Sequence, residues 1–341
     1  MKTILVTGGA GFIGVNFIEY LLDIYNDYRI INLDKLTYAG FKVNIEPFLQ
    51  NSRYEFLWGD VANSWTVEPL IKKADMVVHF AAESNVDLSI IKSDDFLKTN
   101  ILGTKIILDS VKKYGVERIL IVSTDEVYGN AYKDIPSQED SPLMPCSPYA
   151  AAKASQDILA FSYYVTYNLP VIITRCSNNY GPKQDPTKLI PRLLLNAIHD
   201  RHLPVYGRGI NKRDWIYVKD HNRAIDRVLH SPDKYNGEVF NVGSGVELSS
   251  LDIAKLICKH TGKPESLITF VEDRKGHVLR HAVNSEKIKK ELGFEVKTDF
   301  SKAIKETIQW YINNPWWWKA VGTQQAEMLP NYKEVYGFHS V

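Results

Sequence analysis

Residues 3–14 read Thr-Ile-Leu-Val-Thr-Gly-Gly-Ala-Gly-Phe-Ile-Gly, a short apolar run that leads directly into a glycine-rich turn. The run at 3–7 predicts a buried strand, and the spacing of apolar residues over 12–25 predicts a helix after it. Glycine allows a tight turn and a close approach of the backbone to a pyrophosphate, and the start of a helix offers N–H groups to an anion. The stretch predicts dinucleotide-binding positions at Gly8, Gly11, Phe12, Ile13 and Gly14.

Such glycines can also serve the turn alone, and Asp34 strengthens the prediction. It closes the next apolar run, residues 29–34, 34 − 14 = 20 residues after Gly14. From this position a carboxylate accepts a hydrogen bond from the ribose 2′-hydroxyl of NAD and repels the 2′-phosphate of NADP. Lys35 beside it tempers the preference, and Asp34 could instead only cap a turn. We predict NAD as the cofactor, with Asp60, Val61, Ala81 and Ala82 along its adenine and ribose.

Short runs rich in Val, Ile or Leu continue to alternate with helical patterns through the first half of the chain. Strands are predicted at 54–58, 76–80, 119–123 and 171–174, and helices at 96–114 and 149–168. This alternation is typical of a parallel sheet covered by helices. We therefore predict an α/β fold, with a Rossmann-type doubly wound sheet of six parallel strands.

The pattern loosens after about residue 180, where glycine and proline mark turns. Helices are predicted at 189–199, 249–261 and 301–313, and Pro204 opens a short extended segment. These features predict a smaller, irregular α/β domain that binds the substrate. The expected division is 1–180 for the NAD domain, with a segment near 214–243 returning to it, 181–213 and 244–330 for the substrate domain, and 331–341 as a tail.

Composition excludes several classes of partner. Lys+Arg 41 against Asp+Glu 40 gives no overall charge that would favour nucleic acid or an anionic membrane. The start of the chain lacks the pattern of a signal peptide, and no segment approaches the roughly 20 apolar residues of a membrane span. Three distant cysteines, without a CxxC pair or a histidine cluster, indicate neither a disulfide framework nor a zinc site. We expect a cytoplasmic protein with no nucleic-acid partner, no membrane partner and no metal.

A second group of chemically suggestive residues follows the fifth predicted strand, where Thr124, Asp125 and Glu126 are consecutive. Tyr149 comes 149 − 124 = 25 residues later and Lys153 four residues after that, so both lie on one face of a helix. A phenol with a reference pKa near 10 becomes a usable base when a nearby cation favours its ionised form. The spacing is common on helix surfaces, and the two acids could be first-turn helix residues. After a glycine-rich strand and helix, however, the set is specific.

Together these residues resemble the extended short-chain dehydrogenase/reductase family, and the Thr-Asp-Glu run narrows the resemblance to its nucleotide-sugar 4,6-dehydratases. Within that family the chain is most similar to the members that act on dTDP-glucose, over nearly its whole length to about Trp318. Further similar stretches are residues 175–182, 188–191, 213–215, 240–243 and 273–277. Several matching stretches in the right order arise by chance far less often than any one of them.

The resemblance implies a hydro-lyase that acts on a nucleotide-hexose with tightly bound, recycled NAD. C4 is oxidised by hydride transfer to NAD, water leaves across C5 and C6, and the hydride returns to C6. Tyr149 would take the 4-hydroxyl proton, Lys153 would tune it, and both would border NAD; Thr124 would hydrogen-bond the same oxygen. Glu126 is the implied base at C5 and Asp125 the acid at the 6-hydroxyl, which requires neighbouring carboxyl groups in unlike environments.

The resemblance also implies a site for the nucleoside diphosphate. Arg213, Asn241 and Arg274 are expected near the phosphates, because arginine suits bidentate phosphate contacts. Pro204 and Tyr206 are expected beside the base. Arg213 with Asp214 could equally be a surface ion pair of little energetic value. The other implied substrate residues are Ser84, Asn178, Lys188, Leu189 and His277.

Some residues depart from the dTDP-glucose pattern around the expected hexose, namely Asn85, Leu88, Lys183, Asp185, Thr187 and His281. They would make room for another substituent, such as an acetamido group, or they reflect neutral drift at a pocket rim. The alternatives are the same dehydration of UDP-N-acetylglucosamine or another nucleotide-hexose, a nucleotide-sugar C4 epimerase, and a non-catalytic NAD-binding regulator. An epimerase would need Tyr149 and Lys153 but not the acid pair, and the retained catalytic set disfavours the regulator.

Two aromatic features complete the expectations. The family pairs the helices predicted at 96–114 and 149–168 in a homodimer, and Tyr163 and Tyr164 are expected to point outward there. The run Trp316, Trp317 and Trp318 could stack on a sugar, but a packing anchor for the end of the chain is favoured.

Overall fold

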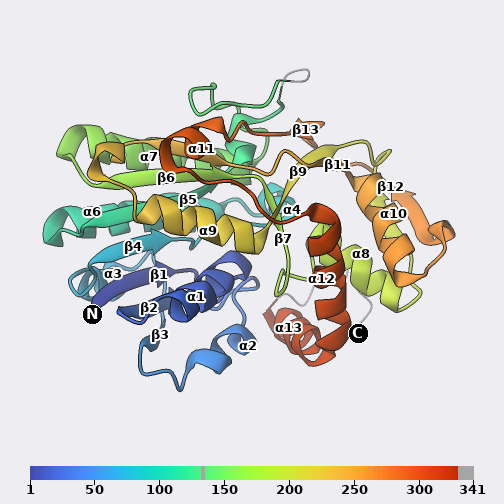
Figure 1. The fold of residues 1–341 in the computed structure, drawn as a ribbon, viewed down its shortest axis with the longest axis horizontal. Helices are drawn as coiled ribbons and strands as arrows, with labels where there is room; N and C mark the ends of the chain where they lie inside the picture. Colours follow the sequence, from blue (N-terminus) through green and yellow to red (C-terminus); the bar gives the residue numbers. More distant parts are fainter. Residues whose placement is uncertain (132–134, 329–341) are drawn as a thin grey trace.

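A seven-stranded parallel sheet forms the centre of the molecule (Figure 1). The computed structural model describes residues 1–131 and 135–328, so the expected tail at 331–341 lies outside the described residues. The order across the sheet is β10-β6-β5-β4-β1-β2-β3. The strands are β1 (Lys2–Thr7), β2 (Tyr28–Asp34), β3 (Tyr54–Trp58), β4 (Met76–His79), β5 (Arg118–Thr124), β6 (Val171–Cys176) and β10 (Val239–Val242).

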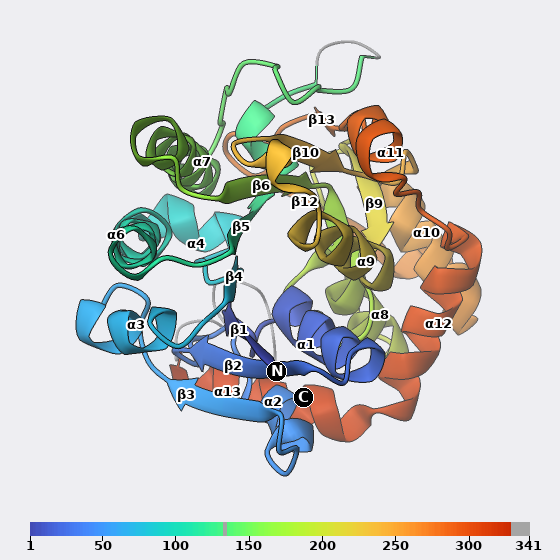
Figure 2. The same ribbon diagram turned by 60° about the vertical axis from the view of Figure 1, so that its left-hand side comes forward.

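Helices cover both faces of this sheet, as Figure 2 shows along the strands. Successive side chains of a strand point to opposite faces. On β1, Ile4 and Val6 join one apolar cluster with α1 (Phe12–Ile24) and α9 (Val218–Leu229). Leu5 joins another on the opposite face, with α3 (Ser64–Ile71), α6 (Thr104–Tyr114) and α7 (Pro148–Tyr167). Both faces are buried at the centre of the sheet, which explains why its central strands are largely apolar. The predicted α/β doubly wound fold is confirmed.

The strand order places a ligand crevice beside β1. The chain runs from β1 outward through β2 to β3, then crosses back to β4 on the other side of β1. Where the order reverses in this way, the connections leave the carboxyl ends of neighbouring strands in opposite directions and open a crevice. The glycine turn after β1 and the ends of β2 and β4 therefore border one space.

Two expectations about the sheet domain are corrected. The sheet has seven strands rather than six, because β10 pairs in parallel with β6 through residues such as Phe240 and Thr174. The helix predicted at 96–114 is not one regular α-helix. It begins with α5 (Asp94–Phe96), continues as a π-helical segment, η2 (Leu97–Gly103), and becomes regular only in α6.

The tyrosines expected to point outward from α7 do not. Tyr163 is buried, and its hydroxyl donates to Asp109 Oδ1 of α6 at 2.6 Å. Tyr164 packs over Gly237, where an added Cβ would lie 2.1 Å from the tyrosine ring. The exposed apolar and aromatic residues of α7 are instead Ile158, Phe161, Val165 and Tyr167.

The second part of the molecule has its own apolar core beyond the carboxyl ends of the strands. One small sheet contains β7 (Asn178–Tyr180), β9 (Lys212–Tyr217), β11 (Glu247–Ser249) and β13 (Arg280–His281), and another pairs β8 (Leu203–Tyr206) with β12 (Ile268–Val271). The main helices around them are α8 (Leu189–Ile198), α10 (Ser250–Thr261), α12 (Phe300–Asn313) and α13 (Pro315–Met328). The short elements are α2 (Lys42–Ile45), α4 (Val86–Ile91), α11 (Glu286–Leu292) and the 3-10 turns η1 (Glu46–Phe48), η3 (Asp125–Tyr128), η4 (Asp233–Tyr235) and η5 (Glu265–Leu267).

The tryptophan run anchors the C-terminal helix, as favoured from the sequence. Trp317 is buried, donates from Nε1 to Asn44 Oδ1 at 2.7 Å and meets Phe41 edge to face. Trp318 is also buried and donates to Tyr311 O at 3.1 Å. Only Trp316 is mostly exposed within the run. Trp317 therefore holds α13 against Phe41 and α2, and Trp318 holds it against α12.

Within residues 1–131 and 135–328, no helix is both long enough and apolar enough to cross a membrane.

Candidate active site

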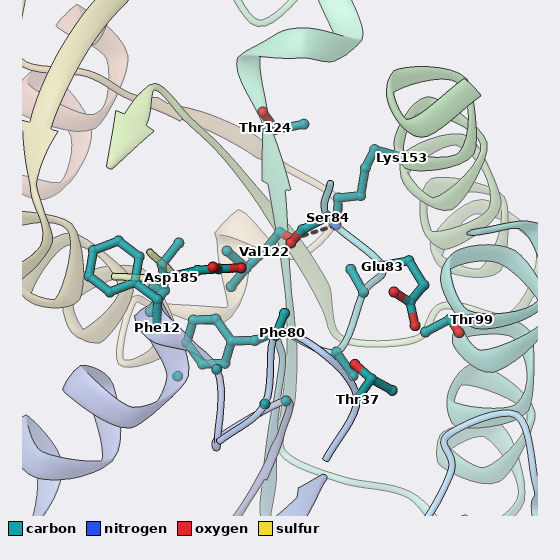
Figure 3. A pocket seen from close by; sticks show the side chains of 18 of the residues that line it. Phe12, Thr37, Phe80, Glu83, Ser84, Thr99, Val122, Thr124, Lys153 and Asp185 are labelled. Carbon is teal, nitrogen blue, oxygen red and sulfur yellow. Dashed lines mark hydrogen bonds between the residues drawn. The ribbon is translucent and has the colours of Figure 1, made fainter. Parts of the chain in front are cut away.

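A cavity of about 270 Å³ lies at the carboxyl ends of β1, β2, β4, β5 and β6 (Figure 3). It brings together all five expected catalytic residues and all the expected cofactor residues. The set consists of Gly8, Gly11, Phe12, Ile13, Gly14, Asp34, Asp60, Val61, Ala81, Ala82, Thr124, Asp125, Glu126, Tyr149 and Lys153. Three expected substrate residues, Ser84, Asn178 and Lys188, border the same cavity.

The glycine turn has the shape that a pyrophosphate needs. A Cβ on Gly8 would lie 2.6 Å from Ala81 N, and one on Gly14 would lie 2.4 Å from Gly8 O, so these two glycines allow the turn to close. At Gly11 a Cβ would lie 3.3 Å from Gly8 O, which is tight but less restrictive, and Gly11 itself borders the cavity. Gly11 is the N-cap of α1 and makes no side-chain cap bond. The helix N-terminus thus faces the cavity without a capping side chain, and these residues fit a dinucleotide.

Asp34 caps the turn and also borders the cavity, so the two interpretations of this residue do not exclude each other. Its Oδ2 accepts from Ala10 N at 2.9 Å and its Oδ1 from Leu36 N at 2.8 Å. A carboxylate has further lone pairs, so both oxygens can accept again. Lys35 is drawn away to Asp60 Oδ2 at 2.9 Å. Because this ion pair holds the ammonium of Lys35 at Asp60, Lys35 argues less strongly for the 2′-phosphate of NADP, and the preference for NAD is strengthened.

The acid pair sits in a tight turn at the end of β5. Thr124 is the N-cap of the 3-10 turn η3, and its Oγ1 accepts from Glu126 N at 3.3 Å. Thr124 Oγ1 also donates to Asp125 Oδ1 at 3.2 Å. Asp125 and Glu126 are therefore the first-turn acids of a short helix and, at the same time, lining residues of the cavity.

The two neighbouring carboxyl groups have unlike environments. Asp125 is 3% exposed, and its Oδ2 has no hydrogen-bond partner among the described residues. Burial raises the pKa of Asp125 well above its usual value, and the negative charges of Glu126 and Asp214 add to the effect. Asp125 therefore holds a proton more readily than an exposed carboxyl group does. Adjacent acids that differ in this way can divide acid and base roles.

Tyr149 and Lys153 lie one helical turn apart on α7, as their spacing predicts. The expected lowering of the Tyr149 pKa is not present in this structure: burial raises it well above 10, and Glu126, Cys176 and Asp125 raise it further. Lys153 Nζ is held by Val122 O at 2.7 Å and by Gln156 Oε1. Burial lowers the pKa of Lys153 to about 8. Near this pH, Lys153 changes between its charged and its neutral form.

A narrow pocket next to the cavity holds the cationic residues. Arg213, Arg274 and His281 line it, and Glu126 belongs to both spaces. Arg274 Nη1 lies 3.5 Å from Asp87 Oδ1, and the interpretation of Arg213 with Asp214 as a surface ion pair is wrong because both are buried. Asp214 instead accepts from the Ser244 hydroxyl at 2.9 Å.

The structure does not bring Asn241 to this pocket, which corrects the expected phosphate contact. Asn241 is fully buried; its Oδ1 accepts from the Tyr128 hydroxyl at 2.8 Å and its Nδ2 donates to Ser137 O at 3.0 Å. Leu189 also lies elsewhere, because it packs against the second apolar core. Both residues are structural in this arrangement.

The residues expected beside the base form a separate group near the arginines. Pro204 and Tyr206 belong to β8, and the ring of Tyr206 meets that of His277 edge to face at 6.2 Å. The guanidinium of Arg192 lies 5.8 Å from the centre of the Tyr206 ring. None of these three expected residues, Pro204, Tyr206 and His277, borders the main cavity.

The residues that depart from the dTDP-glucose pattern lie in several different environments. Asp185 borders the main cavity and His281 the narrow pocket, and neither Asp185 Oδ2 nor the two His281 ring nitrogens has a hydrogen-bond partner among the described residues. Asn85 caps α4 by accepting from Leu88 N at 3.0 Å, and Thr187 donates its backbone N–H to Asp185 Oδ1 at 2.9 Å. Leu88 packs beside Tyr149.

Lys183 forms an ion pair with Glu19 at 2.9 Å. It is one of four non-glycine residues in the described chain with a positive φ, at 64°.

Several lining residues were not predicted from the sequence. Ser123 precedes the predicted Thr124 on β5, and Glu83 follows the predicted Ala82 shortly after the end of β4. The strand ends are therefore the signal that could have found both residues. Thr37 and Gly40 lie in an irregular connection, and Thr99 lies in the π-helical segment. No local pattern marks these three residues, because their position depends on the path of the chain.

Among residues 1–131 and 135–328, no cluster of three or more His, Cys, Asp or Glu side chains could hold a metal ion. Cys146, Cys176 and Cys258 are free thiols.

Comparison with known proteins places this site in a family. The family model described as GDP-mannose 4,6 dehydratase matches residues 5–307. The low-salt glycan biosynthesis protein Agl12 of Haloferax volcanii is 45% identical over 91% of this chain and 99% of its own length.

Solved structures agree with this placement. The dTDP-glucose 4,6-dehydratase DesIV of Streptomyces venezuelae, crystallised with NAD bound, superposes with a TM-score of 0.90 at 42% identity, over 94% of this chain and all of its own. The UDP-glucose 4-epimerase of Thermotoga maritima superposes with a TM-score of 0.85 at 29% identity, over 92% of this chain and all of its own. The epimerase is thus more distant in sequence than the dehydratase.

Proposed function

Because this chain belongs to the nucleotide-sugar 4,6-dehydratases of the extended short-chain dehydrogenase/reductase family, we propose that it is an NAD-dependent nucleotide-hexose 4,6-dehydratase. The product is a nucleotide-linked 4-keto-6-deoxyhexose. The observation that carries this proposal is the acid pair: Asp125 is buried with a raised pKa beside Glu126, in one cavity with Tyr149 and Lys153. A C4 epimerase needs Tyr149 and Lys153 but does not need Asp125 and Glu126.

The residues of the glycine turn would hold the pyrophosphate of NAD, and Asp34 would accept from its adenosine ribose. NAD, when bound, supplies the oxidation of C4 and the later reduction of C6. Lys35 is engaged by Asp60, which leaves the space beside Asp34 suited to a 2′-hydroxyl. DesIV, the relative with the same fold, contains NAD.

We propose a separate role for each catalytic side chain, and three of them transfer a proton. Tyr149 accepts the proton of the 4-hydroxyl, and the charge of Lys153 favours its phenolate against the opposing effect of burial. Thr124 hydrogen-bonds the same oxygen. Glu126 then removes the C5 proton, which a C4 ketone makes acidic, and Asp125 donates its proton to the departing 6-hydroxyl. The raised pKa of Asp125 keeps that proton available.

For the substrate we propose a nucleoside diphosphate linked to a hexose, with dTDP-glucose as the first candidate. Arg213 and Arg274 lie on the far side of Glu126 from the NAD residues, where a diphosphate joined to a sugar in the cavity would reach them. Ser84, Asn178 and Lys188 border the space for the sugar. Asp185, whose Oδ2 has no hydrogen-bond partner among the described residues, and His281, whose ring nitrogens have none, favour a different nucleotide-hexose, such as UDP-N-acetylglucosamine.

A panel of dTDP-, UDP-, CDP- and GDP-hexoses tests the assignment of the substrate. We expect one of them to give a 4-keto-6-deoxy product, identified by mass spectrometry and NMR, without added NAD being consumed. Asp185→Phe and His281→Tyr are expected to move the preference towards dTDP-glucose if the natural substrate is another sugar. An epimerised product that keeps its 6-hydroxyl would contradict the dehydratase assignment, and no turnover on any sugar would favour the NAD-binding regulator.

We also propose that two copies pair through α7. Ile158, Phe161 and Val165 are spaced to lie on one face of this helix, and each is 48–64% exposed. Exposed apolar residues in such a row are typical of an interface. Members of the family pair at this helix according to the resemblance, and the row supplies the apolar surface that Tyr163 does not.

Charged substitutions on this row should separate the copies. Phe161→Lys together with Val165→Lys places two ammonium groups in the interface, where burying them without partners is costly. We expect sedimentation at micromolar concentration to show a dimer for the wild type and a monomer for the double variant. Ile312→Lys, on exposed Ile312 of α12, is the matched control and should stay dimeric. A monomeric wild type would contradict the proposal.

A further inference from the structure

A chain of buried polar side chains extends from Lys153 into the protein, behind the active site. Lys153 Nζ donates to Val122 O at 2.7 Å and to Gln156 Oε1. Gln156 Nε2 donates to Thr104 Oγ1 at 2.6 Å, and His79 Nε2 lies 2.9 Å from the same hydroxyl. The side chains of Lys153, Gln156, Thr104 and His79 are at most 3% exposed.

The direction of these hydrogen bonds follows from the single proton of the Thr104 hydroxyl. The Thr104 hydroxyl donates to Asn100 O at 2.7 Å, so it can only accept from its other two neighbours. Gln156 must therefore turn its NH2 group to Thr104 and its carbonyl oxygen to Lys153. A flipped amide would set N–H groups against the ammonium and leave two acceptors facing each other at Thr104.

His79 reinforces this orientation as a neutral group. Burial lowers the pKa of His79 to about 3, and the charge of Lys153 adds to the effect. Its Nε2 carries the hydrogen donated to Thr104, so its Nδ1 accepts from the Thr7 hydroxyl at 2.7 Å. The chain of bonds ends at β1, next to the glycine turn, and its orientation is fixed at both ends.

Among the other titratable groups around Lys153, Asp157 favours its ammonium most and raises the pKa of Lys153 against the effect of burial. Asp157, on the same helix, shares its charge with Arg175 of β6 at 2.9 Å. Burial raises the pKa of Cys176 on β6 to about 12 and that of Tyr149 well above 10, so burial opposes a negative charge on either group. The charged form of Lys153 therefore depends on Asp157 and on its two carbonyl acceptors, and one of these acceptors belongs to Gln156.

We propose that Gln156 is a positioning residue that keeps Lys153 charged and directed at the reacting groups. It acts from behind, since Lys153 borders the cavity and Gln156 does not. The inference rests on the role proposed for Lys153 in the dehydratase reaction. It adds a residue, and an orienting chain of Thr104 and His79, to the set that controls the proton of Tyr149.

Two substitutions of similar size separate this role from packing. Gln156→Met removes the acceptor and should favour the neutral amine, whereas Gln156→Glu presents a carboxylate and should favour the ammonium. A hydrogen bond to a charged group is worth enough to move the titration of Lys153 by about one pH unit, downward for Met and upward for Glu. Ser155→Ala, at a partly exposed neighbour on α7 whose hydroxyl donates to Ala151 O, is the matched control.

Lys153 can be titrated without turnover by competitive acetylation with acetic anhydride, read peptide by peptide by mass spectrometry. The neutral amine reacts, so the labelling midpoint gives the pKa of Lys153. The decline of turnover at high pH should move with this midpoint in each variant. Circular dichroism and NAD binding show which variants are folded.

Thr104 provides a second test that leaves the Gln156 side chain in place. Thr104→Val frees the amide to flip and should reproduce part of the downward shift of Gln156→Met, while Thr104→Ser should restore the wild-type midpoint. Labelling midpoints that coincide in wild type, Met and Glu variants would overturn the inference. A wild type without turnover on any nucleotide sugar would contradict the proposed function instead, and the labelling would still decide the role of Gln156.

Discussion

Glu126→Gln should stop removal of the C5 proton and leave NAD bound. The amide keeps the shape of the side chain but cannot accept a proton, and loss of a general base costs roughly a hundredfold to ten-thousandfold in rate. Oxidation of C4 needs Tyr149 and Lys153 and should continue. We therefore expect reduced NAD to accumulate during a single turnover, seen by its absorbance, while 4-keto-6-deoxy product is absent and C5 takes up no deuterium from the solvent.

The control for this variant is Glu117→Gln, which removes a surface carboxylate paired with Lys2. It should retain wild-type turnover. Unchanged C5 exchange in Glu126→Gln would remove Glu126 from its assigned role. Loss of NAD from the variant would show instead that the substitution disturbs the cavity.

Tyr149→Phe should prevent the reaction at an earlier step. The ring continues to fill its buried place against Phe96, but the oxygen that receives the 4-hydroxyl proton is gone. We expect a loss of turnover of roughly a hundredfold to ten-thousandfold, with no accumulation of reduced NAD and no C5 exchange.

The contrast between the two variants tests the order of the steps. Glu126→Gln should stop the reaction after oxidation, and Tyr149→Phe before it. Tyr167→Phe, on the same helix and partly exposed, is the control for a tyrosine hydroxyl outside the site. Accumulation of reduced NAD in Tyr149→Phe at the wild-type rate would show that another group accepts the proton.

The sheet and the cofactor end of the site follow from local sequence. The sequence predicts a strand at 76–80, and the structure has β4 (Met76–His79) there, with every residue of the strand buried, because a strand covered on both faces is largely apolar. Gly8, Asp34 and Lys153 reach the cavity for a similar reason: each stands at the end of a strand or at the start of a helix, and the topology brings those ends together.

Features that depend on long-range packing were not predictable in this way. β10 joins the sheet beside β6 from a distant part of the chain, and the π-helical turns of η2 leave no periodic mark. Asn241 lies in a stretch that is similar to the family, yet its side-chain amide is already hydrogen-bonded to Tyr128 and Ser137. The periodicity of apolar residues predicts the boundaries of α7, but it does not predict which neighbouring residues cover Tyr163.

The electrostatic character of the site also needed the three-dimensional structure. Spacing alone suggests that Lys153 lowers the pKa of Tyr149, but burial and the two carboxyl groups raise it. The same burial raises the pKa of Asp125, which is the direction that its proposed acid role requires. A sequence shows which groups can titrate, and packing decides the direction in which each is shifted.

The most direct test is turnover of the accepted nucleotide-hexose in deuterated water without added NAD. The account predicts a 4-keto-6-deoxy product that carries one solvent deuterium at C5, because Glu126 removes the C5 proton and the solvent replaces it. A product epimerised at C4 that contains no solvent deuterium would contradict the account.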